Sequence, residues 1–508
     1  MHDRMRPLHD AEGMRAVDDW AISERGVPSL RLMEAAGAAV ADAVRGLAGE
    51  GPIRIVCGKG NNGGDGLVAA RLLAETGFEV ESLLLWPAAD LSSDAAAKLE
   101  LLEGPAREVG PAEIADSLAG SGVVVDAIFG TGFSGAPRTP AAEAIQAIND
   151  CGVPVVAADI ASGVDASSGE VAAVAVDAAV TVAFHAGKLG HRIAPGKRHA
   201  GDLRVADIGI PAEAPIRPAG REIDASVLAL QPRRGPDSTK FSSGQVLVAG
   251  GSAGLTGAVA LAATAAIRAG AGYAIAAVPA ELEPILEAKL TEVMTRGCPS
   301  DGGAFADDAT EAILDAAQRV AAVVLGPGFG RTDDALTVAR RVAHQVEAPL
   351  VLDADGLNAH HGLLAKLAER TGATVITPHA GELGWLLERP SEEIGAHRLT
   401  AAREAAREAR CVVVLKGDDT IVVDGSAADP MVAVNVIAAP GLATAGTGDV
   451  LAGTIGAFLA RGLPPFEAAC GAVRANATAG VLAAERVGAA ESVIASDVIA
   501  ALPEALRP

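Results

Sequence analysis

Short apolar runs alternate along most of the chain with longer segments in which hydrophobic residues recur at helical spacing. In the N-terminal part, runs of strand character lie at 53–57, 80–86, 123–129, 153–158 and 178–184. Helical patterns such as 30–47 and 140–148 lie between them. Strands that alternate with helices are typical of a parallel sheet covered by helices. We therefore expect an α/β domain of the Rossmann-like, three-layer kind.

The pattern lapses between about Ile210 and Lys240, where prolines break any helix (Pro211, Pro215, Pro218, Pro232 and Pro236). A second α/β series starts at Gln245, with strand candidates at 273–278, 320–325, 349–353, 373–377 and 411–416. The two halves do not align as a sequence repeat. The sequence thus predicts two different α/β domains, with a first domain at 1–215, a linker at 216–240 and a second domain at 241–508.

Composition narrows the range of partners. The formal net charge of −23 disfavours nucleic acids and anionic membranes as partners, and the 3% of aromatic residues leaves few platforms for base stacking. The scattered cysteines form no CxxC pair, which indicates buried thiols in a reducing compartment (Cys57, Cys151, Cys298, Cys411 and Cys470). No apolar run approaches the ~18 residues of a membrane span. We expect a soluble, cytoplasmic protein that binds small molecules.

A glycine-rich turn, Gly58 to Gly66, joins the strand at 53–57 to the next helical pattern. In α/β proteins such a turn lets backbone N–H groups approach a phosphate. Asn61 and Asn62 add side-chain amides, which can donate to a phosphate or offer an oxygen to a cation. A tight turn without a ligand is the simpler alternative, but it would need neither the asparagines nor Asp65. The turn is therefore a candidate binding loop.

A second such turn, Gly441 to Asp449, opens into the apolar helix at 450–459. The free N–H groups of the first helical turn and the helix dipole form an anion site. Asp449 at its mouth could accept a proton from a substrate hydroxyl, although an aspartate there could equally be only a helix cap. Lys416 follows a strand and precedes a turn, so that it can reach phosphate oxygens. Further polar turns follow the strands at 320–325, 349–353 and 373–377, and they are expected at the same edge of the sheet.

These turns together resemble a known family. The second half resembles the NAD(P)H-hydrate dehydratase branch of the ribokinase-like fold, on the basis of Gly250-Gly251-Ser252, Gly326-Pro327-Gly328, Asp353 to Asn358, Thr377-Pro378-His379, Lys416-Gly417 and Gly446-Thr447-Gly448-Asp449. The first half resembles the NAD(P)H-hydrate epimerase domain, on the basis of Gly60 to Gly66, Val125 to Gly132 and Asp159 to Gly163. Both motif sets occur in the expected order over about residues 10–505. The whole chain resembles the bifunctional NAD(P)H-hydrate repair enzymes.

For the first half, the resemblance implies a site for the hydrated dinucleotide, with Asp159 as the base at the epimerising carbon. The implied substrate-binding residues are Asn61, Asn62, Gly63, Gly64, Asp65, Gly130, Thr131, Gly132, Phe133, Ser134, Gly135, Ala136 and Asp159. It also implies a potassium ion on Asn62, Asp126 and Ser162, whose oxygens suit a hard cation. The sequence departs from the family in Ala161, where proline is usual, but keeps Asp159 and Ser162.

For the second half, the resemblance implies phosphorylation of the hydrate by ADP or ATP with magnesium, followed by loss of phosphate. Asp449 is the implied base. The implied hydrate contacts are Ala258, Gly328 (or Gly330), His379 and Asp449. The implied nucleotide contacts are Lys416, Gly417, Asp418, Asp419, Thr420, Gly446, Thr447 and Gly448. Ala380 stands where the family usually has proline after the histidine.

Two other functions use the same loops. A small-molecule kinase would make a stable phosphoester with Asp449, but such kinases lack the first domain. A nucleotide-binding sensor or scaffold would need no base, so that its function would survive Asp449→Asn. The repair of hydrated NADH and NADPH accounts for both halves, and family habit adds a homo-oligomer as an expectation.

Overall fold

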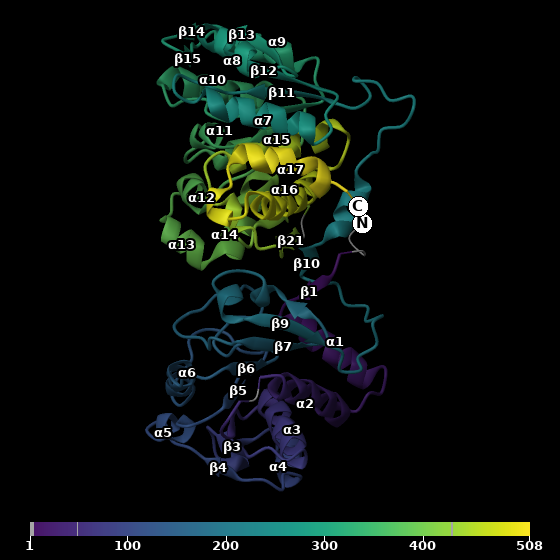
Figure 1. Ribbon diagram of the computed structural model, residues 1–508, viewed down its shortest axis with the longest axis vertical. Helices are drawn as coiled ribbons and strands as arrows, with labels where there is room; N and C mark the ends of the chain where they lie inside the picture. The colour runs from purple at the N-terminus through teal and green to yellow at the C-terminus, as the bar shows by residue number, and fades with distance from the viewer. Residues whose placement is uncertain (1–4, 48, 428–429, 508) are drawn as a thin grey trace. The chain divides into compact units, whose positions relative to one another are not determined.

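The computed structural model describes residues 5–47, 49–427 and 430–507. It divides the chain into two compact units, Pro7–Gly220 and a second unit formed by Met1–Arg6 together with Arg221–Pro508. Each unit is built around a largely parallel sheet with helices against it, which confirms the predicted α/β class (Figure 1). Among the described residues, no helix is both long and apolar enough to cross a membrane.

The N-terminal unit has a fully parallel sheet in the strand order β4-β3-β2-β5-β6-β7-β9. Its strands are β2 (Ile53–Cys57), β3 (Val80–Leu84), β4 (Ala106–Glu108), β5 (Val123–Ala127), β6 (Val155–Ala158), β7 (Val180–Phe184) and β9 (Asp202–Ala206). In addition, β1 (Pro7–His9) pairs in parallel with β8 (Gly187–Lys188). Its helices are α1 (Ala11–Ser23), α2 (Ser29–Arg45), α3 (Asn61–Glu75), α4 (Ser93–Glu100), α5 (Ile114–Leu118) and α6 (Ala141–Asp150).

Two apolar clusters cover the sheet of this unit. One cluster joins α2 and α3 to the sheet, and the other joins α5 and α6 to it. The central strand β5 is buried at every position, as a strand with helices on both faces must be. The edge strand β9 is mostly exposed and was not among the predicted strands, because its polar residues obscure the hydrophobic pattern.

The C-terminal unit has the strand order β13-β12-β11-β16-β17-β18-β19-β20-β21-β10. The strands from β13 to β19 are parallel, whereas β20 is antiparallel to both its neighbours. These strands are β10 (Gly220–Ile223), β11 (Gln245–Ala249), β12 (Tyr273–Pro279), β13 (Met294–Cys298), β16 (Ala322–Leu325), β17 (Leu350–Leu352), β18 (Thr374–Ile376), β19 (Val412–Leu415), β20 (Ile421–Asp424) and β21 (Met431–Asn435). A small hairpin joins β14 (Ser300–Asp301) to β15 (Ala304–Phe305).

The helices of the C-terminal unit include a buried central helix, α15, which packs against α7 and α16 (Figure 1). They are α7 (Thr256–Arg268), α8 (Glu283–Lys289), α9 (Ala309–Ala317), α10 (Asp333–Gln345), α11 (Asp355–Asn358), α12 (Ala380–Leu387), α13 (Ser391–Ala396), α14 (Arg398–Ala409), α15 (Thr447–Ala460), α16 (Pro465–Val487) and α17 (Ala495–Ala505). Gly453 allows α15 to lie directly on α7, because a Cβ there would come within 2.0 Å of the Ala262 carbonyl oxygen. The glycine therefore allows the close approach of α15 to α7.

The segment 216–240, which the sequence predicted to be a linker, contains strand β10 and a 3₁₀ turn at Ala225–Leu230. The structure assigns both elements to the C-terminal unit. Met5 and Arg6 also belong there. Met5 is buried in the core of the C-terminal unit, and its carbonyl oxygen accepts a hydrogen bond of 2.9 Å from Arg221. The prolines therefore obscured a strand, and the N-terminal unit lies between two parts of the other in sequence.

Candidate active sites

The glycine-rich turn of the N-terminal unit is shorter than predicted, because α3 already begins at Asn61. Gly58 must be a glycine here, since a Cβ would lie 1.9 Å from the carbonyl oxygen of Ile128. The backbone after β2 therefore passes directly against the end of β5. As a result, the first turns of α3, which contain Asn62 and Asp65, lie at the carboxyl ends of the central strands, where α/β proteins bind ligands.

The residues implied for potassium lie together at this edge. The hydroxyl of Ser162 donates to Asp126 Oδ1 at 2.6 Å, and the Ser162 N–H donates to Asp126 Oδ2 at 2.8 Å. The amide of Asn62 donates to the Phe129 carbonyl oxygen at 2.9 Å. Burial raises the pKa of Asp126 to about 6. No cationic side chain of the described residues is bound to this carboxylate.

Asp159 follows β6 and has a backbone φ of 64°, which is unusual for a residue other than glycine. Its Oδ1 accepts from Lys188 Nζ at 2.5 Å and from the Phe184 N–H at 3.2 Å. The side chain of Lys188 is 0% exposed, and Nζ also donates to the Phe184 carbonyl oxygen at 3.0 Å. The ring of His191 contacts the Asp159 carbonyl oxygen at 2.9 Å. Lys188 and the Phe184 N–H thus hold the carboxylate of Asp159, and His191 contacts its carbonyl oxygen.

Lys188 and His191 were not predicted as site residues. Both lie in or just after the two-residue strand β8, which the hydrophobic pattern does not reveal. Burial and the neighbouring Lys188 lower the pKa of His191 to about 3, so that its ring is neutral at physiological pH. In the sequence, only the position of Lys188 shortly after the strand at 178–184 could have indicated that it belongs to the site.

A cavity of about 140 Å³ opens beside Asp159. Asn61, Asp65 and Thr131 line it, as the resemblance implied, and so do Asp18 and Asp94, which no motif had indicated. The remaining residues of the predicted glycine-rich segment do not line this cavity (Gly130, Gly132, Phe133, Ser134, Gly135 and Ala136). The ring of Phe133 instead stacks on that of Phe129, with 4.4 Å between the ring centroids.

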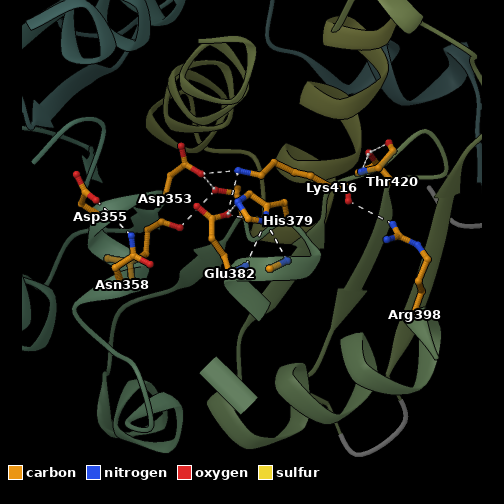
Figure 2. Close-up of polar contacts among 12 residues, drawn as sticks. Asp353, Asp355, Asn358, His379, Glu382, Arg398, Lys416 and Thr420 are labelled. Atoms are coloured by element: carbon orange, nitrogen blue, oxygen red, sulfur yellow. Dashed lines mark hydrogen bonds and ion pairs between the residues drawn. The ribbon is translucent and has the colours of Figure 1, made fainter. Parts of the chain in front are cut away.

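The C-terminal unit gathers charged side chains at the carboxyl ends of β17, β18 and β19. Lys416 Nζ lies 3.0 Å from Asp353 Oδ1 and 3.5 Å from Glu382 Oε2, and Figure 2 shows it reaching toward both carboxylates. The hydroxyl of Thr377 donates to Asp353 at 2.6 Å. Burial lowers the pKa of Lys416 and the two carboxylates raise it, with the net effect a pKa above the ordinary value. Lys416 therefore keeps its positive charge at the mouth of the site.

Asp449 lies in the first turn of α15, next to this network. Burial, reinforced by the negative charge of Asp353 and opposed by Lys416, raises the pKa of Asp449 to about 7. Gly448 lies beside the lysine, since a Cβ there would be 3.5 Å from Lys416 Nζ. The N-terminus of α15, the ammonium group of Lys416 and the Asp449 carboxylate, whose pKa is about 7, thus lie close together.

A larger cavity of about 480 Å³ extends from Lys416 along the start of α15. Six of the predicted nucleotide residues line it (Lys416, Gly417, Asp418, Thr420, Thr447 and Gly448). Gly446 and Asp419 do not line it. The carboxylate of Asp419 is buried against the guanidinium of Arg398, whose Nε lies 2.9 Å from Asp419 Oδ2 and whose second nitrogen lies 2.7 Å from Asp419 Oδ1. Arg398 also donates to the Lys416 carbonyl oxygen at 3.3 Å (Figure 2). The buried pair of Arg398 and Asp419 thus holds the backbone of this loop.

The predicted hydrate contacts lie at the same sheet edge. His379 caps α12, with Nδ1 accepting from the Gly381 N–H at 3.0 Å, and its side chain is largely exposed. Glu382 completes this cap by accepting from the His379 N–H at 2.8 Å. Gly328 lies against Ala258, because a Cβ on Gly328 would be 3.1 Å from Ala258 Cβ. Glu382, Asp353 and Arg398 were not predicted as site residues, although Asp353 and Glu382 belong to the motifs used for the resemblance.

Comparison with known proteins agrees with this division of the chain. The NAD(P)H-hydrate dehydratase family profile matches residues 246–504, and that of the YjeF-related protein N-terminus matches residues 29–190. A crystal structure of the ADP/ATP-dependent NAD(P)H-hydrate dehydratase from Bacillus subtilis with ATP/Mg²⁺ is 26% identical, covers 55% of this chain and 94% of its own, and has a TM-score of 0.45.

Full-length relatives carry both halves. The bifunctional NAD(P)H-hydrate repair enzyme of Moorella thermoacetica is 39% identical over 98% of this chain and 96% of its own length. The enzyme of the same name from Salinibacter ruber is 38% identical over 98% of this chain and 95% of its own. The two matched profiles and the identity over nearly the entire length show that this chain belongs to the family of bifunctional NAD(P)H-hydrate repair enzymes.

Proposed function

We propose that the chain divides the repair of hydrated NADH and NADPH between its two units. The N-terminal unit interconverts the R and S hydrates, and the C-terminal unit dehydrates the S hydrate at the expense of ADP or ATP. The observation that carries this proposal is Asp449, a carboxylate with a pKa of about 7 placed between an anion-binding helix N-terminus and the cation of Lys416. Few surface loops would combine these three groups.

In the C-terminal unit, Asp449 accepts the proton of the ring hydroxyl, and the hydroxyl oxygen takes the terminal phosphoryl group of the nucleotide. The carbon–oxygen bond then breaks with phosphate as the leaving group, and loss of a proton from the neighbouring carbon restores the ring double bond. Lys416 and the N–H groups at the start of α15 stabilise the charge on the phosphoryl oxygens.

The remaining roles in this unit follow from position. Ala258, Gly328 and His379 contact the hydrate beside Asp449, and the cavity at Lys416, Gly417, Asp418, Thr420, Thr447 and Gly448 holds the nucleotide. Asp419 and Gly446 act on the shape of these loops rather than on the ligand. A magnesium ion bound with the nucleotide would neutralise phosphate charge, held largely by phosphates and water.

In the N-terminal unit, Asp159 acts as the base at the epimerising carbon, with Asn61, Asp65 and Thr131 around the bound hydrate. Potassium fits the residues beside it. The Asp126 carboxylate is buried without a cationic side chain among the described residues, and the hydroxyl oxygen of Ser162 lies 2.6 Å from it. The Phe129 carbonyl oxygen lies 3.5 Å from that hydroxyl and 2.9 Å from the amide nitrogen of Asn62. These are the ligands of a hard cation. Such an ion would supply positive charge beside the dinucleotide.

Epimerisation is therefore expected to depend on potassium. When KCl is replaced by tetramethylammonium chloride at equal ionic strength, the rate of R/S interconversion should fall, because the organic cation is too large for the buried oxygens. Asp126→Asn should weaken the apparent affinity for potassium by about 10–100-fold. Epimer ratios measured by chromatography test both effects, and dehydration of pure S hydrate serves as the control. An equal rate of interconversion in both salts would contradict a potassium requirement for epimerisation.

The proposed function is tested with a mixture of both NADH-hydrate epimers, magnesium, potassium and either ADP or ATP. The absorbance of the reduced nicotinamide should recover completely with at least one nucleotide, and that nucleotide identifies the phosphate donor. Recovery that stops once the S hydrate is consumed would refute epimerisation by the N-terminal unit. No recovery with either nucleotide would refute the repair function and favour a small-molecule kinase.

The substrates and the cysteines indicate the cellular compartment of the enzyme. We place it in the cytoplasm, because the cysteines are all unpaired thiols and hydrated dinucleotides arise where NADH and NADPH are used. Assembly into a homo-oligomer stays a prediction, for which sedimentation velocity of the full chain is the measurement.

A further inference from the structure

A carboxylate that belongs to no recognised motif lines the cavity of the N-terminal unit. Asp18 lies in the middle of α1, between Val17 and the exposed Asp19. The helix packs its apolar face, which includes Val17 and Trp20, onto the core of the unit, and this packing fixes the helix. Asp18 lies at the border of that face and lines the same cavity as Asp159. Two elements far apart in sequence thus bring two carboxylates to one cavity.

The two carboxylates have different partners. Asp159 accepts from the buried Lys188 and from two backbone N–H groups. Asp18 has no hydrogen-bond or ion-pair partner among the described residues, although it lies in the fields of Asp159, Lys188 and Asp19. Burial, followed by the negative charge of Asp159, raises the pKa of Asp18 to about 6. One carboxylate is held as a base, whereas the other readily keeps a proton.

The chemistry of epimerisation needs both an acid and a base. Hydration of a dihydronicotinamide ring, which is an enamine, places the hydroxyl on a carbon bonded to the ring nitrogen. Inverting that carbon requires one of its bonds to break and form again. Hydroxide is a poor leaving group, whereas a protonated hydroxyl leaves as water while the nitrogen lone pair forms a C=N⁺ bond. Asp159, bound to the lysine, cannot be the donor of that proton and the acceptor in the same step.

We propose that Asp18 is the general acid of the epimerase site and that it protonates the ring hydroxyl of the hydrate while Asp159 serves as the base. This inference rests on the proposed epimerase function of the unit. The carbon–oxygen bond breaks, water departs, and a second water adds to the opposite face of the iminium carbon. Asp159 takes the proton of that second water, and exchange with solvent returns the proton to Asp18. In the reverse direction the two carboxylates exchange roles.

Asp65 is the alternative donor, because it lines the same cavity and burial raises its pKa well above the ordinary value. It lies in the first turns of α3, where a negative charge is favoured by the helix dipole, and Lys98 opposes the increase in its pKa. Asp18 lies in the middle of α1, away from a helix N-terminus, and the charge of Lys188 likewise opposes the increase in its pKa. The geometry therefore favours Asp18, and the experiment distinguishes the two.

The test compares Asp18→Asn with Asp19→Asn in the full chain. Asp19 is the matched control, since it is the neighbouring aspartate on the same helix but is exposed and outside the cavity. Asp18→Asn should slow R/S interconversion by about 10²–10⁴-fold, the usual contribution of a general acid. Asp19→Asn should stay within about twofold of the native rate, as a surface substitution does. Dehydration of pure S hydrate by the same preparation measures the amount of active C-terminal unit, and urea unfolding of the N-terminal unit within the full chain shows whether the substitution leaves that unit folded.

The pH profile separates an acid from a residue that only supports the fold. In the native chain the rate should fall as pH rises above about 6, the pKa of Asp18, and Asp18→Asn should abolish this decline. The groups facing Asp18 are Asp19 on its own helix and Asp65, Asp94, Asp159 and Lys188 on the others, so Asp65→Asn is measured in parallel. If Asp65→Asn lowers the rate of interconversion but the rate still falls above about pH 6, the result supports Asp18 as the acid.

Two results would overturn the inference. One is a rate for Asp18→Asn within threefold (about 0.7 kcal/mol) of native. The other is loss of the alkaline decline in Asp65→Asn but not in Asp18→Asn, which would identify Asp65 as the acid. A native chain that does not interconvert the epimers is a different failure, because it would refute the epimerase function itself.

Discussion

Asp449→Asn should lower the rate of nucleotide-dependent dehydration by about 10²–10⁴-fold, because an amide cannot accept the proton of the ring hydroxyl. Binding of the nucleotide should change little, since the cavity is formed by Lys416 and the loops around it. The measurement is recovery of reduced nicotinamide from pure S hydrate under saturating ADP or ATP. Asp333→Asn is the matched control, because Asp333 also lies in the first turn of a helix but is exposed at the surface.

Asp449→Asn should also change how the free energy of unfolding depends on pH. The pKa of Asp449 is about 7 in the folded chain, above the ordinary value near 4 of an unfolded one. The folded state therefore binds the proton more tightly, and the free energy of unfolding falls as pH rises from about 4 to about 7. Asp449→Asn removes this loss, so its melting temperature should exceed the native value at pH 8 and match it near pH 4. An active variant, or one destabilised at pH 8, would contradict the assignment.

Lys188→Met should have the largest effect in the N-terminal unit. It leaves the Asp159 carboxylate buried without its cation, which typically destabilises a protein by about 3–5 kcal/mol. Epimerisation should also be lost, because the Asp159 carboxylate then lacks the contact that fixes it at the cavity. Urea unfolding of the N-terminal unit, followed within the full chain, measures the stability, and epimer chromatography measures the activity.

The double substitution Lys188→Met with Asp159→Asn separates the two effects. It replaces a buried ion pair with neutral groups and should recover most of the lost stability, but no epimerisation. Arg107→Met is the control, because the ion pair of Arg107 with Glu81 is partly exposed and should contribute no more than about 1 kcal/mol. If the double variant is as unstable as Lys188→Met alone, then the lysine acts through packing rather than through its charge.

The parts of the site that could be predicted from the sequence are those at the ends of regular strands. Lys416 and Asp353 each follow an apolar run, and the carboxyl ends of parallel strands meet at one edge, so their proximity could be foreseen. The first turn of α15 could be foreseen for the same reason, since a glycine turn opens into an apolar helix. Periodicity and strand order carry this information.

Other residues could not be foreseen, because their position depends on packing across the fold. Lys188 belongs to a strand of two residues, too short for any pattern, and Asp18 reaches its cavity only through the docking of α1. Asp419 was expected to face the nucleotide, but in the structure its carboxylate is bound to the buried Arg398. Neighbouring residues of a loop point in different directions, and the sequence does not reveal which side chain is turned inward.

Met5, buried in the core of the C-terminal unit, has a consequence for synthesis of the chain. Its hydrogen-bond partner Arg221 is separated from it by 216 positions, so the ribosome makes the whole N-terminal unit before that contact can form. The carbonyl oxygen of Met5 must therefore wait for this hydrogen bond while another unit is synthesised between the two residues. Closing so long a loop costs only slightly more entropy than closing a short one, but it delays the contact. Vectorial synthesis thus makes the epimerase unit the first to mature and the dehydratase unit the last.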